Sequence, residues 1–251
     1  MNLAEMPEIK AYLPSHPGNY RHTRRPSGDI RYIVIHYTGN TNDTAMNNLR
    51  YYAEANRGAS AHYYCDESGV FRSVADEYAA YAVGLGSMSK PYTKNPSHYR
   101  ICNNSNSLSI EICGSKTSSE GTEKTKWNAA QLCAALMKKY NVPPKNVIRH
   151  YDVTGKSCPH WAVAEPSKWD MFKAYVVTCM EGNMTYEKFC EFMDRWQKDR
   201  AAEKAREQWE IDAMEEAANN GYITGGRPHS HVTRGELAVV LQRLKKKRRL
   251  Y

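Results

Sequence analysis

The sequence predicts an α/β fold, with a mixed central β-sheet flanked by helices and a small all-helical domain after it. Short β-branched and aromatic runs, typical of strands, alternate with longer segments that carry apolar residues at helical spacing. After residue 182 the sequence changes to a stretch of alternating charge, which is typical of a solvated connecting helix. We therefore expect two domains, at residues 1–182 and 183–251.

The strands are expected where apolar, β-branched residues cluster. They are residues 31–37, 61–65, 70–74, 107–113 and 147–150. Residues 66–69, Asp-Glu-Ser-Gly, supply a turn between the second and third of these, which predicts a hairpin. Residues 107–113 alternate cleanly, so that if Leu108 and Ile110 face one side, Glu111 faces the other.

The helices of the first domain are expected at residues 44–55, 125–140 and 161–180. Residues 1–28 are rich in Pro, Arg and His and predict an irregular lead-in, and residues 84–106 form a long loop whose length favours a functional role. In the second domain, helices are expected after Thr185, at residues 213–219, and from the capping sequence at Thr233 to Leu244.

Composition excludes several classes of protein. The formal charge is +8, but residues 245–249 hold five of these charges and leave +3 (8 minus 5) for the rest, so a nucleic-acid-binding face is not indicated. No apolar run is long enough for a membrane span. The first residues lack the basic and apolar regions of a signal peptide, so we expect synthesis in the cytoplasm.

The seven cysteines are an odd number in a chain of 251 residues, which favours reduced thiols. Most are interpreted as small buried apolar residues, and a disulfide between Cys102 and Cys113 is left open.

The segment 149–159 carries the densest chemistry in the chain. It places His150, Lys156 and Cys158 within nine positions, and Pro159 directly follows the thiol. An imidazole and a thiolate are good zinc ligands, and a nearby ammonium group can stabilise an oxyanion. This spacing alone is a weak signal, and it needs a third ligand and a base from elsewhere in the chain.

Four blocks together resemble a known family. They are residues 32–38 (YIVIHYT), 60–63 (SAHY), 109–112 (SIEI) and 150–159 (HYDVTGKSCP). In this order they resemble the zinc-dependent N-acetylmuramoyl-L-alanine amidases, the family that phage endolysins share with bacterial autolysins and peptidoglycan recognition proteins. The resemblance covers roughly residues 30–175 and is strongest to phage and prophage amidases of clostridia-like Gram-positive bacteria.

The resemblance implies roles for individual residues. His36, His150 and Cys158 match the three ligands of one zinc ion, Glu111 matches the general base, and Lys156 matches the lysine that stabilises the oxyanion. The implied reaction is hydrolysis of the amide bond between N-acetylmuramic acid and L-alanine in peptidoglycan. An endolysin or autolysin of this kind would reach the cell wall after release through a membrane lesion made by another protein.

Some assignments stay open at this point. Tyr37, His62 and Tyr81 are candidates for substrate contacts, although His62 fits a hydrogen-bonded core histidine better. The family's tyrosine before the second-strand histidine is replaced by Ala61, and a Trp-His pair by Tyr81 and Ala82. The alternative to an enzyme is a non-catalytic peptidoglycan-binding module of the same fold, against which Cys158 argues.

The C-terminal domain resembles a single S-layer-homology motif in residues 213–243. Such motifs bind secondary cell-wall polymers, usually as several copies. The competing interpretation is a helical unit that forms a homodimer or a higher oligomer. Wall binding and oligomerisation are compatible with each other.

Overall fold

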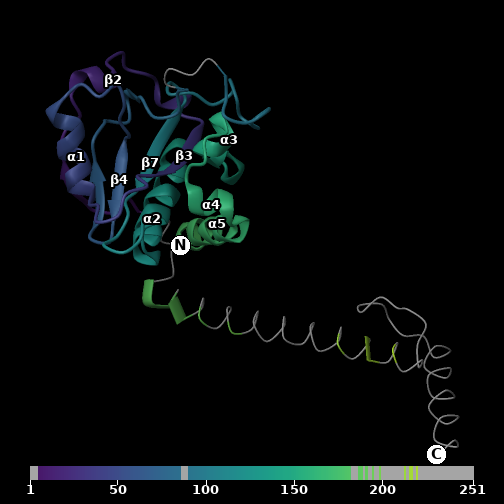
Figure 1. Cartoon of the computed structure of the whole chain (residues 1–251). Helices are drawn as coiled ribbons and strands as arrows, with labels where there is room; N and C mark the ends of the chain where they lie inside the picture. Colours follow the sequence, from purple (N-terminus) through teal and green to yellow (C-terminus); the bar gives the residue numbers. More distant parts are fainter. Residues whose placement is uncertain are drawn as a thin grey trace, which may run out of the picture. The chain divides into compact units, whose positions relative to one another are not determined.

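The computed structural model describes residues 5–85 and 90–181, with scattered helical positions between 186 and 219 (Figure 1). The chain divides into a unit of Met1–Tyr186 and a unit of Glu187–Tyr251. The turns and helices predicted for the C-terminal domain lie largely outside the described residues, so its organisation stays a prediction. None of the described helices is long and apolar enough to cross a membrane.

A six-stranded mixed sheet, in the order β1-β5-β4-β7-β3-β8, forms the centre of the first unit. Its strands are β1 (Ile9–Tyr12), β3 (Tyr32–Tyr37), β4 (Tyr63–Asp66), β5 (Gly69–Arg72), β7 (Ser107–Ile112) and β8 (Val147–Arg149). β4 and β5 are antiparallel across the predicted hairpin, and the other neighbouring pairs are parallel. A separate antiparallel pair joins β2 (Tyr20–Arg21) to β6 (Ala79–Ala80). The predicted mixed sheet is confirmed.

Within residues 5–85 and 90–181, five α-helices and three short 3-10 turns accompany the strands. The α-helices are α1 (Ala45–Glu54), α2 (Glu123–Tyr140), α3 (His150–Thr154), α4 (His160–Ala164) and α5 (Pro166–Glu181), and the 3-10 turns are Pro17–Asn19, Ser27–Asp29 and Pro144–Asn146. The caps follow from the sequence. Thr44 accepts a hydrogen bond from the backbone of Asn47 to begin α1, and Asn141 ends α2 in the left-handed conformation with φ 53°.

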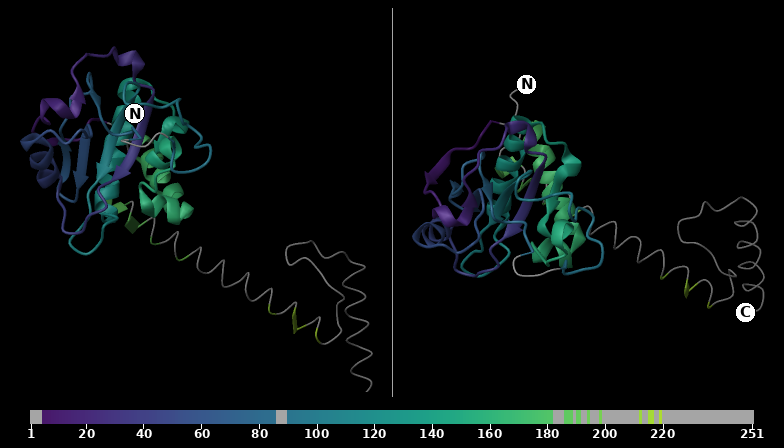
Figure 2. Two further views of the ribbon diagram at one scale, coloured as in Figure 1. Left: turned by 45° about the horizontal axis from the view of Figure 1, so that its top comes forward. Right: turned by 90° about the horizontal axis from the view of Figure 1, so that it is seen from above.

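The sheet separates α1 from α2, as Figures 1 and 2 show. Adjacent residues of β4 mark the two faces, since successive side chains of a strand point to opposite sides. Tyr64 packs with Leu49 of α1, whereas the hydroxyl of Tyr63 donates to Asp76, which also accepts from Tyr140 of α2. α1 packs mainly on β4 and β5.

The N-terminal segment differs from its prediction. Residues 9–12 were expected to be irregular, but they form β1, which pairs in parallel with β5 at the edge of the sheet. The alternating exposure of β1 fits an edge strand, and its apolar residues are too few for a strong strand signal in the sequence.

Two further boundaries are corrected in the C-terminal half of this unit. His150 begins the short helix α3 and does not end the strand β8. The helix predicted over 161–180 is two helices, because Pro166 disfavours helical backbone at Glu165, where φ is −128° and ψ is 90°. The optional disulfide is absent, since Cys102 and Cys113 are both free and belong to different core clusters.

Candidate functional site

Three side chains from distant parts of the chain converge at the ends of β3 and β8. His36, His150 and Cys158 are all buried, and their candidate ligand atoms lie within 4.8 Å of one another. The two imidazole rings are 4.7 Å apart between centroids, and Cys158 Sγ lies 3.9 Å from His36 Nδ1. The structure thus brings together the three residues that the sequence motifs selected.

The parallel pairing of β3 with β8 brings the two histidines together. Ile35 lies opposite Arg149, so the residues that follow them, His36 in β3 and His150 at the start of α3, are carried to the same edge of the sheet. The thiol is then fixed by a backbone hydrogen bond of 2.8 Å from Tyr151 N to the carbonyl oxygen of Cys158. This bond closes the segment between the second imidazole and the thiol into a compact loop.

A partly buried ion pair fixes the start of that loop. The guanidinium of Arg149 donates to both carboxylate oxygens of Asp152, at 3.1 and 2.8 Å, and Asp152 also accepts from Arg149 N at 2.9 Å. A further hydrogen bond of 2.9 Å links Arg149 Nη1 to the carbonyl oxygen of Ala162. The loop is therefore tied to α4, which gives His150 a fixed position before any ligand arrives.

The protonation of the three side chains suits a metal ion. Burial, together with the charges of His150 and Lys156, holds the pKa of His36 well below its ordinary value, and burial lowers the pKa of His150 to about 4. Both rings are therefore neutral near pH 7. Among the described residues, neither Nε2 atom of these rings has a hydrogen-bond partner. Burying ring nitrogens without a partner costs folding free energy, unless a bound ligand such as a metal ion interacts with them.

The thiol completes the donor set. Burial and the charge of Glu111 raise the pKa of Cys158 to about 12, so the proton is retained near pH 7 unless a cation displaces it. Two neutral imidazoles and one sulfur form a donor set that fits a metal ion.

Glu111 lies beside this cluster. It is the register partner of His36 across β3 and β7 and of Tyr64 across β7 and β4, so His36 and Glu111 project from the sheet face on which α1 packs. Its Oε2 is enclosed and has no hydrogen-bond partner among the described residues. Burial raises the pKa of Glu111 to about 7, with the charge of Lys156 opposing and that of Asp43 adding to the rise. A carboxyl group with such a pKa exchanges protons readily near neutral pH.

Lys156 supplies the positive charge of the site. Its side chain is exposed, and its charge acts on the pKa values of His36, His150 and Glu111. The preceding residue, Gly155, has a φ of 75° and caps α3 in the left-handed conformation. The turn at Gly155 directs the chain from α3 back to Cys158, with Lys156 at its outer side.

The three candidate substrate contacts lie in different surroundings. Tyr37 is half-buried at the end of β3, where burial and the charges of Cys158 and Glu120 raise its pKa, so it lies next to the cluster. His62 is buried. Its Nδ1 accepts a hydrogen bond from Ser109 N at 3.0 Å, and its Nε2 lies 3.0 Å from both Arg25 Nη2 and the Tyr78 carbonyl oxygen. Its ring nitrogens are thus engaged within the core, as in the core-histidine interpretation.

Tyr81 lies at the end of β6, where its backbone bonds to Ser60 through both the amide and the carbonyl group. These contacts place its main chain beside the Asn19 and Ser60 region rather than beside Cys158. Of the three candidates, Tyr37 interacts with Cys158, and the charge of His62 lowers the pKa of His36.

Sequence patterns did not reveal the part that Asp43 plays here. Asp43 Oδ1 accepts hydrogen bonds from Thr44 N and Asn48 Nδ2, as a residue at the start of α1 is expected to do. Its Oδ2 is enclosed without a partner among the described residues, and its charge raises the pKa of Glu111. In the sequence Asp43 directly precedes the helix expected at residues 44–55, and this position gives no hint of the nearby glutamate.

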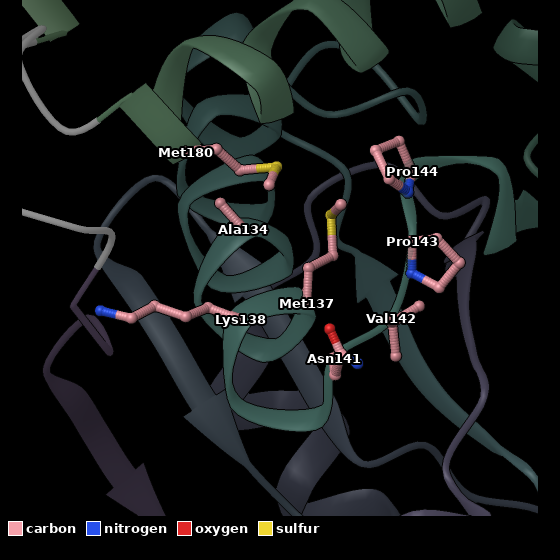
Figure 3. Close-up of a pocket in the computed structure, with 8 residues that line it drawn as sticks. All are labelled: Ala134, Met137, Lys138, Asn141, Val142, Pro143, Pro144 and Met180. Carbon is pink, nitrogen blue, oxygen red and sulfur yellow. The ribbon is translucent and has the colours of Figure 1, made fainter.

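A cavity of about 320 Å³ lies elsewhere in this unit (Figure 3). Met137 of α2, Met180 of α5 and residues 142–144 line it, and Figure 3 shows the side chains of the two methionines on the same side as this segment. It lies before the start of β8, whereas His150 follows the end of that strand. The cavity is therefore separate from the His-Cys cluster.

Comparisons with known proteins identify a family and several relatives. The family model of N-acetylmuramoyl-L-alanine amidases matches residues 26–161. The amidase CwlL of Bacillus licheniformis is 30% identical over 167 residues, which are 63% of this chain and 44% of CwlL. The amidase BlyA of Bacillus subtilis is 29% identical over 161 residues, 61% of this chain and 42% of BlyA. The match thus spans less than half the length of these relatives.

Solved structures share the fold. PlyL has 28% sequence identity and a TM-score of 0.55, over 68% of this chain and 97% of PlyL. The PlyG catalytic domain has 28% identity and a TM-score of 0.55, over 71% of this chain and 99% of that domain. The similarity covers nearly all of each solved structure, and the mixed sheet with its flanking helices is common to them.

Proposed function

The chain belongs to the N-acetylmuramoyl-L-alanine amidase family, and we propose that it hydrolyses the amide bond between N-acetylmuramic acid and L-alanine in bacterial peptidoglycan. The observation that carries this proposal is the arrangement of Glu111 beside the His36, His150 and Cys158 cluster. A donor set for one metal, a carboxyl group and an ammonium group are what metal-assisted amide hydrolysis requires.

We propose zinc as the metal, held by His36, His150 and Cys158. Imidazole nitrogen and thiolate sulfur are preferred zinc ligands, and three protein ligands leave a position open for catalysis. When bound, zinc supplies a Lewis acid that polarises a carbonyl group and lowers the pKa of water. The support within the chain is the pair of buried, unpartnered Nε2 atoms and the buried thiol.

Glu111 acts as the general base in this proposal. The carboxylate takes the proton of the attacking water, and as the carboxylic acid it returns that proton to the L-alanine nitrogen when the amide bond breaks. The pKa of about 7 supports both roles, because a group with this pKa can accept and donate a proton near neutral pH. Its position opposite His36 supports this role, because His36 is one of the proposed metal ligands.

Lys156 stabilises the negative charge that develops on the amide oxygen. Its ammonium group is exposed, and its charge reaches His36, His150 and Glu111, so it lies on the side from which a substrate approaches. A positive charge held in place before the reaction stabilises an oxyanion without reorganisation. Tyr37 is proposed to contact the substrate beside Cys158.

The rest of the chain is included in the proposal on sequence grounds. Residues 1–182 form the catalytic domain, and residues 183–251 bind a secondary cell-wall polymer, form a homo-oligomer, or both. The protein is proposed to be a phage or prophage endolysin, or an autolysin, that is made in the cytoplasm and acts on the wall after release.

The test is digestion of purified Gram-positive cell walls by the full chain. New N-terminal L-alanine and new reducing sugar are measured with zinc, with chelator, and with zinc restored after chelation. We expect new alanine amines that disappear with chelator and return with zinc, with no new reducing sugar. Wall binding without new amines would instead support the non-catalytic module, and new reducing sugar would indicate a glycosidase.

A further inference from the structure

A short exposed strip adjoins the loop that carries Lys156. In residues 90–94, Lys90, Tyr92 and Lys94 are exposed, whereas Pro91 and Thr93 are half-buried. The strip thus has an outer side with two ammonium groups and one aromatic ring, and an inner side that faces the protein. Tyr92 is 51% exposed, so much of its ring is available to a ligand.

The inner side of the strip is attached to the loop. Tyr92 N donates to the Thr154 carbonyl oxygen at 2.8 Å, two residues before Lys156. A Cβ atom on Gly155 would lie 2.1 Å from Thr93 Oγ1 and 2.5 Å from Thr93 N, so the two chains are in close contact. Further along, His98 N donates to the Asp152 carbonyl oxygen at 2.8 Å. The strip and the Lys156 loop therefore form one edge of the site (Figure 1).

The charge of this edge is strongly positive. No acidic residue occurs between Glu77 and Glu111 in the sequence. On the loop side, the carboxylate of Asp152 is already paired with Arg149 at 2.8 Å. The outer ammonium groups of the strip add to that of Lys156, so an anionic ligand is favoured on this side.

We propose that Lys90, Tyr92 and Lys94 form a subsite that binds the carboxylates of the peptide stem and makes the enzyme prefer stems whose carboxylates are free. This inference rests on the proposed amidase function. The lactyl carboxyl group of N-acetylmuramic acid is consumed in the scissile amide, so the glycan side of the substrate is uncharged there. The remaining carboxylates of the substrate lie on the peptide side, which is the side that two ammonium groups recognise.

The chemistry of the strip suits this ligand. Lysine binds a carboxylate as a flexible point charge and does not need the fixed two-pronged geometry of arginine. The ring of Tyr92 offers an apolar face for the aliphatic parts of the peptide between its carboxylates. The contacts of residues 92 and 93 hold the main chain of the strip in place, which lowers the entropy cost of binding.

The experiment compares two soluble muramyl peptides, one with free carboxylates and one with the same groups as carboxamides. The kcat/KM for each is measured with the zinc-loaded full chain and with the double variant Lys90→Gln/Lys94→Gln. We expect the wild type to prefer the free carboxylates by up to roughly tenfold at low salt, as for two exposed charge pairs. The double variant should lose this preference, and salt should reduce it in the wild type.

The matched control is the double variant Lys138→Gln/Lys145→Gln. Both lysines are exposed but lie before β8, at the other end from His150, so this variant should keep the wild-type preference. For the ring, Tyr92→Ala should raise KM for both peptides, whereas Tyr12→Ala, also 51% exposed, should not. An unchanged preference in Lys90→Gln/Lys94→Gln would overturn the inference.

Failure of the inference is distinguishable from failure of the proposed function. If the wild type cleaves both peptides equally well, the amidase function holds and the subsite is refuted. If it cleaves neither with zinc present, the amidase function fails, and calorimetric binding of the same two peptides decides the subsite. The subsite is supported if the wild type binds the carboxylate peptide more tightly than the carboxamide peptide and if Lys90→Gln/Lys94→Gln loses this difference. Equal binding of the two peptides by the wild type would refute the subsite.

Discussion

His36 and Glu111 lie directly opposite each other on the parallel strands β3 and β7, on the sheet face where Tyr64 packs against α1. This single register places a candidate metal ligand and a candidate base on the same face of the sheet. A slip of one residue in either strand would turn one of the two side chains to the other face. The buried apolar residues Ile33 and Ile35, on the face opposite His36, fix the register of β3 against such a slip.

The first prediction concerns the base. Glu111→Gln keeps the size of the side chain but removes its ability to take a proton, so kcat should fall roughly a hundred- to ten-thousand-fold. Zinc content, measured by mass spectrometry of the metal, should stay at the wild-type level. Glu54→Gln, the same change at an exposed position of α1, is the control and should leave activity intact. Near-wild-type activity of Glu111→Gln would remove Glu111 from the mechanism.

The second prediction concerns the thiol. Cys158→Ser replaces a sulfur ligand by a hydroxyl group, which is a poor ligand for zinc at neutral pH, so zinc affinity and activity should both fall sharply. Cys179→Ser, on α5, is the control, because Cys179 is partly exposed and lies outside the cluster. Equal zinc affinity in the two variants, measured by competition with a chromophoric chelator, would show that Cys158 is not a ligand.

The third prediction concerns the turn before Lys156. Gly155→Ala places a Cβ at a φ of 75° and drives it against Thr93, so the free energy of unfolding should fall by about 2 kcal/mol. The ligand loop should shift as well, which lowers zinc affinity. Gly28→Ala is the control, because a Cβ there meets no atom within 4 Å. Chemical denaturation of both variants measures the difference, and equal stability would contradict the tight contact.

The fourth prediction concerns pH and the buried carboxylate of Asp76. Burial alone raises its pKa, but hydrogen bonds from Tyr140, Tyr63 and Lys139 outweigh burial, so the pKa lies below its ordinary value. The unfolded chain then binds the proton at higher pH than the folded chain. Ionised Asp76 therefore stabilises the folded state. This stabilisation is complete above the ordinary aspartate pKa of about 4, and it is lost as the pH falls through the lower pKa of Asp76 in the folded chain.

Asp76→Asn tests this dependence. The variant should be less stable than the wild type at pH 7, and its stability should fall less between pH 5 and pH 2. Urea denaturation across that range, compared with Asp29→Asn at an exposed position, measures both effects. Parallel pH curves for Asp76→Asn and the wild type would show that Asp76 does not carry the dependence.

The sequence predicts the centre of the fold well, for physical reasons that particular elements illustrate. The run from Tyr32 to Tyr37 is apolar and β-branched because β3 lies between two neighbours and is buried on both faces. The hairpin follows from the turn at Asp66–Gly69 between two such runs. The edge strand β1 was missed because half of its residues face solvent, which weakens the pattern that identifies a strand.

The convergence of His36, His150 and Cys158 could be expected from the family motifs, since the pattern names the residues even though it gives no distances. The contact between Thr93 and Gly155 could not, because it joins two loops that are far apart in the sequence and have no periodic pattern. The same holds for the charge of Asp43 on Glu111, which depends on where α1 begins relative to β7.

The most direct test of the central claim is a zinc titration of chelator-treated full-length protein, with bound zinc and amide hydrolysis measured in the same samples. We predict that hydrolysis of a muramyl peptide rises in proportion to bound zinc and levels off at one ion per chain. His36→Ala should bind no zinc at this site and release no peptide. Full hydrolysis by the zinc-free protein, or unchanged zinc binding and activity in His36→Ala, would contradict the account.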